Sequence, residues 1–334
     1  AFHIATTGRP GPVLIDMPKD IQMDDLNVEW DPPMNLPGYF VEQRFAKPEQ
    51  IKQVIAAIKL AKRPIVYAGG GVIAANASEE LREFVSKTGI PTTMTVMGLG
   101  AFPANDPLSL DMLGMHGSAY ANYAVRDCDL LLAFGVRFDD RATGKAEEFC
   151  RKATIVHVDI DPSELGKIRM PNLGLGGDVR EVLELLLPDV PFDDRPEWSL
   201  EREVLRERCA PPLEVSGGDL HPRSLFRALS SAGAGDRIVA TDVGQHQMWV
   251  AGNFTFRNPR TLLTSGGLGT MGFGLPAAIG AALARPGTPV LCVSGDGSIQ
   301  MNIQELGTAS QYRLPIKIFI LNNEYMCMVR QWQE

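Results

Sequence analysis

The sequence contains few cysteines, and their placement argues against two common uses of this residue. The 334-residue chain has five, which are scattered and odd in number, and no two of them form a Cys-x-x-Cys motif. Such a set predicts neither a disulfide framework nor a zinc site, and it indicates a reducing compartment. We therefore expect a cytoplasmic protein; a plastid targeting peptide would lie before Ala1 and stays open as an alternative.

Concentrated positive charge is also missing. The formal net charge is −8, and Lys and Arg do not cluster, so the sequence predicts no nucleic-acid surface. Residues 261–284 lack any charged side chain, as a membrane span would. Six glycines and Pro276 fall in this window, however, which favours a buried loop that enters a helix at Pro276. We therefore expect no membrane association.

The most informative stretch runs from Val290 to Asn323. An apolar run ends in the turn Gly295-Asp296-Gly297, a helical pattern with Ile303 and Leu306 on one face follows, and a second β-type run ends at Asn323. This order predicts a strand, a tight turn, a helix and a second strand, which form a βαβ unit. Both polar clusters then fall at the carboxyl ends of neighbouring parallel strands, where open α/β sheets bind their ligands.

The residue types in these two clusters fit a metal-bound diphosphate. Glycine on both sides of Asp296 allows a sharp turn and a close approach of the backbone to a phosphate. The Asp296 carboxylate and the Asn323 amide oxygen are hard donors suited to Mg²⁺, whose octahedral shell phosphate oxygens would complete. An Asp-Gly turn alone is a common turn. The strand before it and the Asn-Asn pair at the end of the next strand favour a cofactor site.

The size of the chain predicts two domains. Residues 23–47 and 188–218 are rich in proline and are interpreted as linkers. Between them, residues 48–187 predict an α/β domain that begins with an amphipathic helix and closes with a helix from Val179. Its expected strands are 65–68, 91–96, 130–134 and 154–160. Residues 219–334 form the last predicted domain.

Two shorter features of the chain leave alternatives open. Residues 1–22 predict the end of a helix, a turn around Arg9 and a short buried strand at Val13–Ile15. The pattern Gly69-x-Gly71-x-x-Ala74 is similar to a dinucleotide fingerprint, but no acidic residue ends a strand about 20 positions later, so it predicts no NAD site. A turn beside a flavin diphosphate and a plain turn both stay open for these glycines.

The motif GDG, a helix-length spacer and NN resembles the thiamine-diphosphate motif of a large enzyme family. Three flanking segments narrow this resemblance: GQHQMW at 244–249, SGGLGTMGFGLPAAIGA at 265–281 and MVRQWQ at 328–333. Together they resemble the catalytic subunit of acetohydroxyacid synthase (acetolactate synthase), a thiamine-diphosphate-dependent family, and the resemblance extends over the whole chain.

The resemblance implies an architecture of successive doubly wound parallel-sheet domains. Residues 1–22 would be the tail of the pyrimidine-binding domain, 48–187 a central FAD-binding-type domain, and 219–334 a truncated diphosphate-binding domain. In the family a whole domain precedes the position of Ala1 and carries the glutamate that activates the cofactor. The chain as given is therefore expected to be inactive alone, although its parent would be an enzyme.

The activity implied is the first common step of branched-chain amino-acid biosynthesis. Pyruvate is decarboxylated and its two-carbon fragment is added to a second 2-oxo acid, either pyruvate or 2-oxobutyrate. The cofactors implied are thiamine diphosphate, Mg²⁺ and FAD, the last in a non-redox role because the net reaction transfers no electrons. The partners implied are a second copy in a homodimer or homotetramer with a shared active site, and a small regulatory subunit.

The resemblance also assigns roles to individual residues. Met271, Gln245 and His246 are the catalytic candidates: Met271 wedges between the two cofactor rings, and the other two reach the diphosphate. Asp296, Asn323 and the carbonyl of Tyr325 would bind the metal. The remaining contacts to thiamine diphosphate are expected from Gly244, Gly269, Gly295, Gly297, Ser298 and Met328.

Residues elsewhere would hold the flavin and the substrate. The resemblance places Arg9, His116, Arg137, Asp159 and Asp178 at FAD, and Met115, Arg141, Val329 and Trp332 at the substrate. Arg141 would bind the carboxylate of the acceptor through a bidentate pair. Each residue also has a simpler interpretation, such as core packing for Met271 or a local ion pair for Arg141. The family usually has glycine where this chain has Cys327, which adds bulk near the site.

Three alternatives to the synthase stay open. Two are relatives with the same cofactors, glyoxylate carboligase and pyruvate oxidase. Trp332 and Arg141 favour the synthase over these, because they form an acceptor pocket that a simple decarboxylase does not need. The third is a non-catalytic binding subunit that retains a nucleotide pocket, which the intact Asp296 and Asn323 pair argues against.

Overall fold

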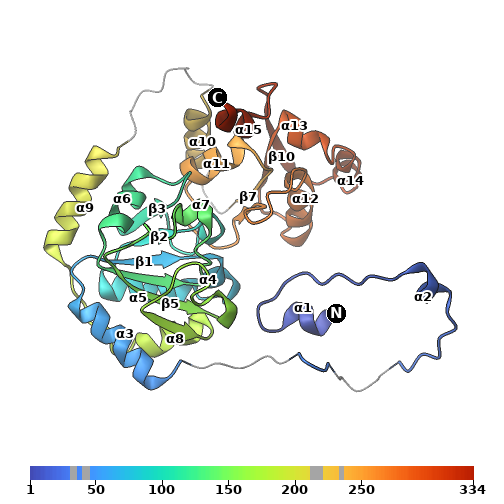
Figure 1. Cartoon of the computed structure of the whole chain (residues 1–334). Helices are drawn as coiled ribbons and strands as arrows, with labels where there is room; N and C mark the ends of the chain where they lie inside the picture. The colour runs from blue at the N-terminus through green and yellow to red at the C-terminus, as the bar shows by residue number, and fades with distance from the viewer. Residues whose placement is uncertain (31–35, 40–45, 211–220, 233–236) are drawn as a thin grey trace.

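The computed structural model describes residues 1–30, 36–39, 46–210, 221–232 and 237–334 (Figure 1). The described strands form two sheets in which every pairing is parallel. Most consecutive strands are connected through α-helices, and the β2–β3 and β5–β6 connections contain only short 3₁₀ turns. The predicted α/β class with parallel sheets is therefore confirmed.

The first sheet has the strand order β3-β2-β1-β4-β5-β6. The order reverses between β1 and β4, which is the arrangement that leaves a ligand crevice at the carboxyl edge of a doubly wound sheet. The strands of this sheet are β1 (Pro64–Ala68), β2 (Thr92–Met94), β3 (Ser109–Met112), β4 (Leu130–Phe134), β5 (Thr154–Asp159) and β6 (Leu173–Gly176).

Helices cover both faces of this sheet because alternate strand residues point to opposite sides. Val66 and Ala68 of β1 belong to a core that also contains α3, α5 and α8, whereas Ile65 and Tyr67 belong to one that contains α6. The helical elements of this part are α3 (Pro48–Leu60), α4 (Gly70–Ala74), α5 (Ser78–Thr88), α6 (Ala119–Asp127), α7 (Asp140–Thr143), α8 (Val179–Leu186) and the short 3₁₀ turns Val96–Gly98 and Pro162–Glu164.

The second sheet has the order β10-β9-β7-β8. Leu321 at the end of β10 pairs with Gly295 at the end of β9, so the two predicted polar clusters do leave the sheet side by side. The elements of this part are α10 (Pro222–Ser231), β7 (Ile238–Thr241), α11 (Gln245–Asn253), β8 (Leu262–Leu263), α12 (Gly274–Ala284), β9 (Val290–Gly295), α13 (Asp296–Gln300), α14 (Glu305–Gln311), β10 (Ile316–Leu321) and α15 (Cys327–Gln333).

The helix predicted between β9 and β10 differs in detail from the structure. It is divided into α13 and α14, with a turn at residues 301–304. Ile303 and Leu306, expected on one face of this helix, are 49% and 40% exposed. The prediction of a single helix is therefore corrected to two short helices.

The two sheets share one hydrophobic core. Phe254 and Phe256, which follow α11, belong to the same cluster of buried side chains as the strands of the first sheet. Hydrogen bonds reinforce this junction: Nη2 of Arg260 donates to the carbonyl oxygen of Ile73 at 2.9 Å, and Nη2 of Arg82 donates to the carbonyl oxygen of Arg257 at 2.8 Å. The sheets therefore pack together as one body.

The segment 188–218, interpreted as a linker, contains a packed helix. Helix α9 (Pro196–Arg208) begins with proline in its first turn, where a missing N–H costs nothing. Trp198 is 2% exposed and its Nε1 donates to the carbonyl oxygen of Pro64 at 3.3 Å. The interpretation of this part as a plain linker is therefore wrong, and residues 211–218 lie outside the described residues.

The first residues of the chain also differ from expectation. Helices α1 (Phe2–Thr6) and α2 (Lys19–Met23) are present, and the segment between them has no strand. Leu14 and Ile15 are 88% and 67% exposed, so the buried strand predicted at Val13–Ile15 is wrong. A strand needs a neighbour for its backbone groups, and no described strand lies beside this segment. Part of the first predicted linker, 31–35 and 40–45, lies outside the described residues.

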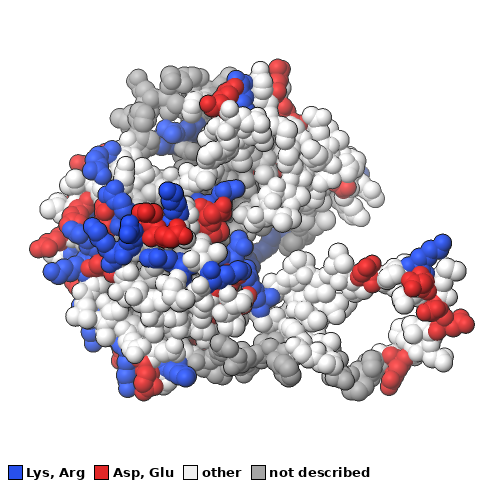
Figure 2. All heavy atoms as spheres, viewed as in Figure 1, with Lys and Arg blue, Asp and Glu red and all other residues white. Residues whose placement is uncertain are grey.

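Charged side chains of both signs mix on the face shown in Figure 2, mostly over the part of the molecule that contains the first sheet. The described part of the chain contains no helix that is both long enough and apolar enough to cross a membrane.

Candidate functional site

A cavity of about 180 Å³ lies where β7, β9 and β10 end, at the carboxyl edge of the second sheet. It collects the predicted cofactor residues of this part of the chain, which come from four separate segments. The lining residues are Val243, Gly244, Gln245, His246, Trp249, Gly269, Met271, Gly295, Asp296, Gly297, Ser298, Leu321, Asn323, Tyr325, Met326, Cys327, Met328 and Val329.

His246 forms part of the cavity wall, and its ring packs closely against Gly244 and Gly295. An added Cβ at Gly244, whose φ is +153°, would lie 2.8 Å from Cε1 of His246. A Cβ at Gly295 would lie 3.1 Å from Nδ1 of the same ring. Contacts this short require movement of the ring, so glycine at both positions allows His246 to occupy the wall.

His246 carries an unused hydrogen-bonding atom. The residue is 5% exposed, and its Nε2 is buried without a partner among the described residues. Burial lowers the pKa of the imidazole, and the nearby Asp242 and Asp296 oppose this only in part. A buried polar atom without a partner is costly, so one nitrogen of this ring is left for a ligand.

The oxygen donors at the end of β9 and β10 fit a metal that a diphosphate helps to bind. Asp296 begins α13 directly after β9, and Asn323 follows β10, with its Oδ1 accepting a hydrogen bond of 3.2 Å from the backbone N–H of Tyr325. The described residues contain no group of three His, Cys, Asp or Glu side chains that would hold a metal by itself. One carboxylate and one amide suit Mg²⁺ only if further oxygens complete the shell.

The glycine-rich loop before α12 brings Met271 to the cavity. The Met271 Cε lies 3.9 Å from the point where a Cβ on Gly297 would be, which is ordinary van der Waals contact. The loop is anchored by Asp242, a fully buried carboxylate at the end of β7 that the sequence analysis did not identify. Its position directly after a strand, two residues before Gly244, is the signal that would have indicated it.

The end of the chain closes one side of the cavity only in part. Met328 and Val329 of α15 line it, and Cys327 does as well. Nε2 of Gln245 donates to Oε1 of Gln331 at 2.9 Å, which connects α11 to α15. Trp332 is 63% exposed and does not line the cavity, so the structure does not bring this predicted substrate residue to the site.

The predicted flavin and substrate residues of the first sheet all lie at its carboxyl edge. Met115 and Arg141 come from neighbouring loops, because the backbone N–H of Met115 donates to the carbonyl oxygen of Arg141 at 2.8 Å. Burial lowers the pKa of His116, and the nearby Arg141 lowers it further. The Arg141 side chain is 71% exposed and pairs with Asp140 at 3.1 Å, whereas Arg137 is exposed and pairs with no described residue.

Arg9 reaches the same edge from the start of the chain. Its Nη1 lies 2.9 Å from Oε1 of Glu164 and 3.3 Å from Oδ2 of Asp161, so it already has two carboxylate partners. Burial raises the pKa of Asp159 to about 6, although the backbone N–H of Asp161 and the charge of Arg9 lower it. Asp178 caps α8 by accepting a hydrogen bond of 2.7 Å from the backbone N–H of Arg180.

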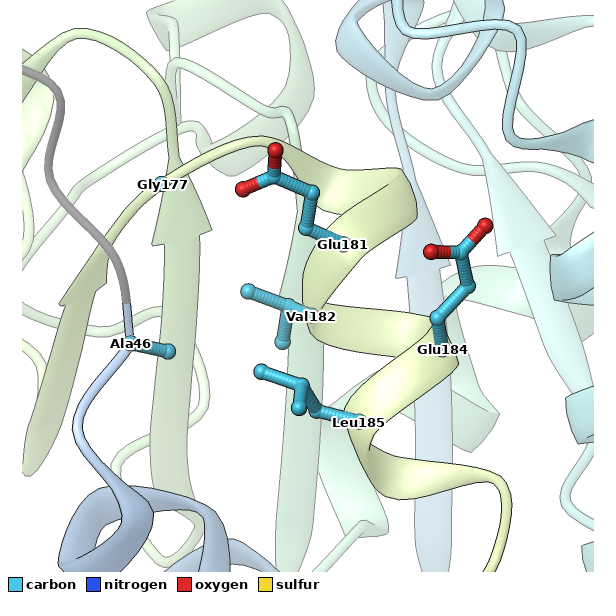
Figure 3. A pocket seen from close by; sticks show the side chains of 6 residues that line it. All are labelled: Ala46, Gly177, Glu181, Val182, Glu184 and Leu185. Carbon is cyan, nitrogen blue, oxygen red and sulfur yellow. The ribbon is translucent and has the colours of Figure 1, made fainter.

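Two further features near this sheet are not assigned to a ligand. A Cβ on Gly69 or Gly71 would lie 2.1 Å from the carbonyl oxygen or 2.5 Å from the Cα of Gly135, so close packing of the turns after β1 and β4 accounts for these glycines. A hollow of about 310 Å³ lies beside α8 (Figure 3), and no predicted site residue lines it. It is lined by Ala46, Gly177, Glu181, Val182, Glu184 and Leu185.

Two family models match most of the chain. The thiamine pyrophosphate enzyme central domain matches residues 51–186, and the thiamine pyrophosphate enzyme C-terminal TPP-binding domain matches residues 242–334. The first match covers most of the first sheet with its helices, and the second covers the cavity. The two sheets therefore correspond to two successive domains of one family.

Curated relatives match over the whole chain. The chain is 48% identical to acetolactate synthase 1, chloroplastic, of Zea mays over 344 residues, which is 100% of this chain and 53% of that protein. It is 48% identical to acetolactate synthase 2, chloroplastic, of Nicotiana tabacum over 341 residues and 47% identical to acetolactate synthase, chloroplastic, of Arabidopsis thaliana over 344 residues, in both cases over 100% of this chain and 51% of the relative. The chain thus spans about half the length of the curated relatives it matches.

Proposed function

The chain belongs to the thiamine pyrophosphate enzymes, and we propose that it is the catalytic part of an acetolactate synthase. The reaction would be the decarboxylation of pyruvate and transfer of the two-carbon fragment to pyruvate or 2-oxobutyrate. The observation that carries the proposal is the cavity of the second sheet. It gathers His246, Met271, Asp296 and Asn323 at one edge, in a chain about 48% identical throughout to acetolactate synthases.

The residues of the cavity would bind and orient the cofactor. When bound, thiamine diphosphate supplies the carbon nucleophile and the electron sink for decarboxylation. Asp296, Asn323 and the carbonyl of Tyr325 would hold Mg²⁺ against the diphosphate, and the free nitrogen of His246 would meet a diphosphate oxygen. Met271 would hold the cofactor in its bent form, because a thioether side chain adapts its shape to a ring it contacts.

A second carboxylate is needed and would come from outside this set. Among the described residues, Asp296 is the only acidic one that lines the cavity, and its proposed role is metal binding. We therefore keep the proposal that the glutamate that activates the cofactor belongs to another segment, contributed by the partner in a homodimer or homotetramer. It follows that residues 1–334 alone would form no acetolactate.

A small regulatory subunit stays a proposed partner. FAD is a further part of the proposal, and its expected binding residues lie at the edge of the first sheet. His116, Arg137, Asp159 and Asp178 follow or end four strands at the carboxyl edge of the first sheet, where a doubly wound sheet binds nucleotides. The two carboxylate partners of Arg9 compete with a flavin phosphate for that guanidinium. Arg141 stays the proposed partner of the acceptor carboxylate, since its guanidinium is exposed and held by one ion pair.

The test uses the protein in its full natural length, supplied with thiamine diphosphate, Mg²⁺ and FAD. Acetolactate formed from pyruvate, without oxygen uptake or bleaching of the flavin, is the expected result. Acetate formed together with flavin reduction would instead assign the protein to the oxidase branch. Absence of any product while thiamine diphosphate is bound would favour a non-catalytic binding subunit.

The cellular location is proposed on the same terms. We keep the cytoplasm as the proposed location. The plastid is the alternative, because the matched relatives are named as chloroplast proteins. Fluorescence microscopy of the full reading frame fused to a fluorescent protein distinguishes the two.

A further inference from the structure

We propose that Asp242 and Asn302 are positioning residues that fix the loop carrying Met271 and thereby set where Met271 enters the cavity. Neither residue lines the cavity, so neither is expected to touch a ligand there. The inference rests on the proposed binding of thiamine diphosphate. It adds the two side chains that position Met271, the residue proposed to lie between the two cofactor rings.

Gly272, the residue that follows Met271, is held through both its backbone N–H and its carbonyl oxygen. The backbone N–H of Gly272 donates to Oδ1 of Asp242 at 2.8 Å, and the carbonyl oxygen of Gly272 accepts from Nδ2 of Asn302 at 2.8 Å. Gly272 has a φ of +89°, and a Cβ there would lie 2.7 Å from Nδ2 of Asn302. Only glycine fits both this conformation and this contact. Met271 therefore precedes a residue with little freedom to move.

Asp242 is a buried carboxylate whose partners are backbone amides. It is fully buried and forms no ion pair with a described Lys or Arg side chain. Besides Gly272, the N–H groups of Val243 and Gly274 donate to it at 2.9 and 3.2 Å. A buried charge is tolerated only when hydrogen bonds replace its water. An apolar residue here would leave three N–H donors without this partner, two of them in buried hydrogen bonds, so the carboxylate organises the loop.

The two residues that hold Gly272 lie close in sequence to the proposed diphosphate and metal residues. Asp242 follows β7, two residues before Gly244, and its own N–H donates to the carbonyl oxygen of Val293 in β9 at 2.8 Å. Asn302 follows α13, the helix that begins at Asp296. These two hydrogen bonds therefore fix the Met271 loop relative to the residues proposed to bind the diphosphate and its metal, so the position of Met271 is set relative to that end of the cofactor.

The experiment measures the dissociation constant of thiamine diphosphate by calorimetry in the full-length protein with Mg²⁺. Asn302→Ala removes the hydrogen bond to the Gly272 carbonyl and a longer one, 3.4 Å, that Oδ1 accepts from Nε2 of Gln304. We expect affinity to fall roughly three- to tenfold. Asp242→Asn disturbs the loop more strongly. Its affinity for thiamine diphosphate is interpreted only if its circular dichroism spectrum matches that of the wild-type protein. The matched control is Gln50→Ala, because Nε2 of Gln50 also donates to a glycine carbonyl, that of Gly174 at 3.1 Å, on the first sheet.

A double-mutant cycle separates positioning from general loosening. If Asn302 acts through Met271, the loss caused by Asn302→Ala becomes much smaller in a Met271→Ala background. Additive losses, or an affinity for Asn302→Ala equal to that of Gln50→Ala, would overturn the inference while the proposed function stands. Failure of the wild-type protein to bind thiamine diphosphate would instead overturn the proposed function.

Discussion

Gly295 and His246 occupy complementary space, since a Cβ at position 295 would lie 3.1 Å from the His246 Nδ1. The ring also lies against Gly244, where an added Cβ would be 2.8 Å from the His246 Cε1. Gly295→Ala is expected to displace the ring and to weaken thiamine diphosphate binding by roughly ten- to a hundredfold, as overpacking by one methyl does. Calorimetry measures this. Gly252→Ala, where the new Cβ meets no neighbour within 4 Å, is the control.

The charge of Asp296 is expected to matter only through a metal. Asp296→Asn preserves the shape of the side chain and removes the anionic donor that Mg²⁺ prefers. We expect wild-type affinity for thiamine diphosphate to rise at least tenfold when Mg²⁺ replaces EDTA, and this gain to disappear in the variant. A variant that keeps the full Mg²⁺ effect would show that the metal binds elsewhere.

Arg195 is expected to contribute strongly to stability. Its buried guanidinium donates to the carbonyl oxygens of Ile58 and Thr88 at 3.1 Å each, in the last turns of α3 and α5, and burial lowers its pKa. Arg195→Met keeps much of the packing but leaves these carbonyls without partners, so we expect a loss of about 2–4 kcal/mol in the free energy of unfolding. Urea unfolding measures it, and the exposed Arg151→Met should change little.

Asp159 should make stability depend on pH. Its pKa in the folded protein is about 6 against 3.8 for the free side chain, so the folded state holds the proton more tightly. Stability from this group is present below about pH 4 and is lost as pH rises through 6, with a total of about 3 kcal/mol. Asp159→Asn keeps an oxygen for the N–H of Asp161 and should remove this loss. Urea unfolding of the wild-type protein and of Asp159→Asn is compared at pH 4.5 and 7.0. If the two proteins differ in unfolding free energy by the same amount at both pH values, the expectation is contradicted.

The sequence predicted which residues meet at the edge of the second sheet, because local signals marked them. Strands β9 and β10 are mainly apolar runs, the first ending at Gly295 and the second followed by Asn322 and Asn323, and parallel pairing then brings Asp296 and Asn323 to one edge. The pair of hydrogen bonds that holds Gly272 was not predictable in this way. Its partners lie 30 residues away on either side, and only the fold brings Asp242 and Asn302 together.

The failures have physical causes that no local pattern encodes. Ile303 and Leu306 follow a helical period, but the period does not reveal the turn at residues 301–304 that divides the helix. The prolines of 188–218 suggested a linker, yet Pro196 opens a helix and Trp198 anchors it in the core. Strands as short as β6, with its alternating glycines, carry too few apolar side chains to be recognised.

The shared core at Phe254 and Phe256 has a consequence for how the protein survives in a cell. Two sheets with a common core melt together, so a ligand held only by the second sheet also protects the first. Scarcity of that ligand would then raise the unfolded fraction of the whole chain, and proteases would remove both domains at once. The abundance of this protein would thus report the supply of its cofactor.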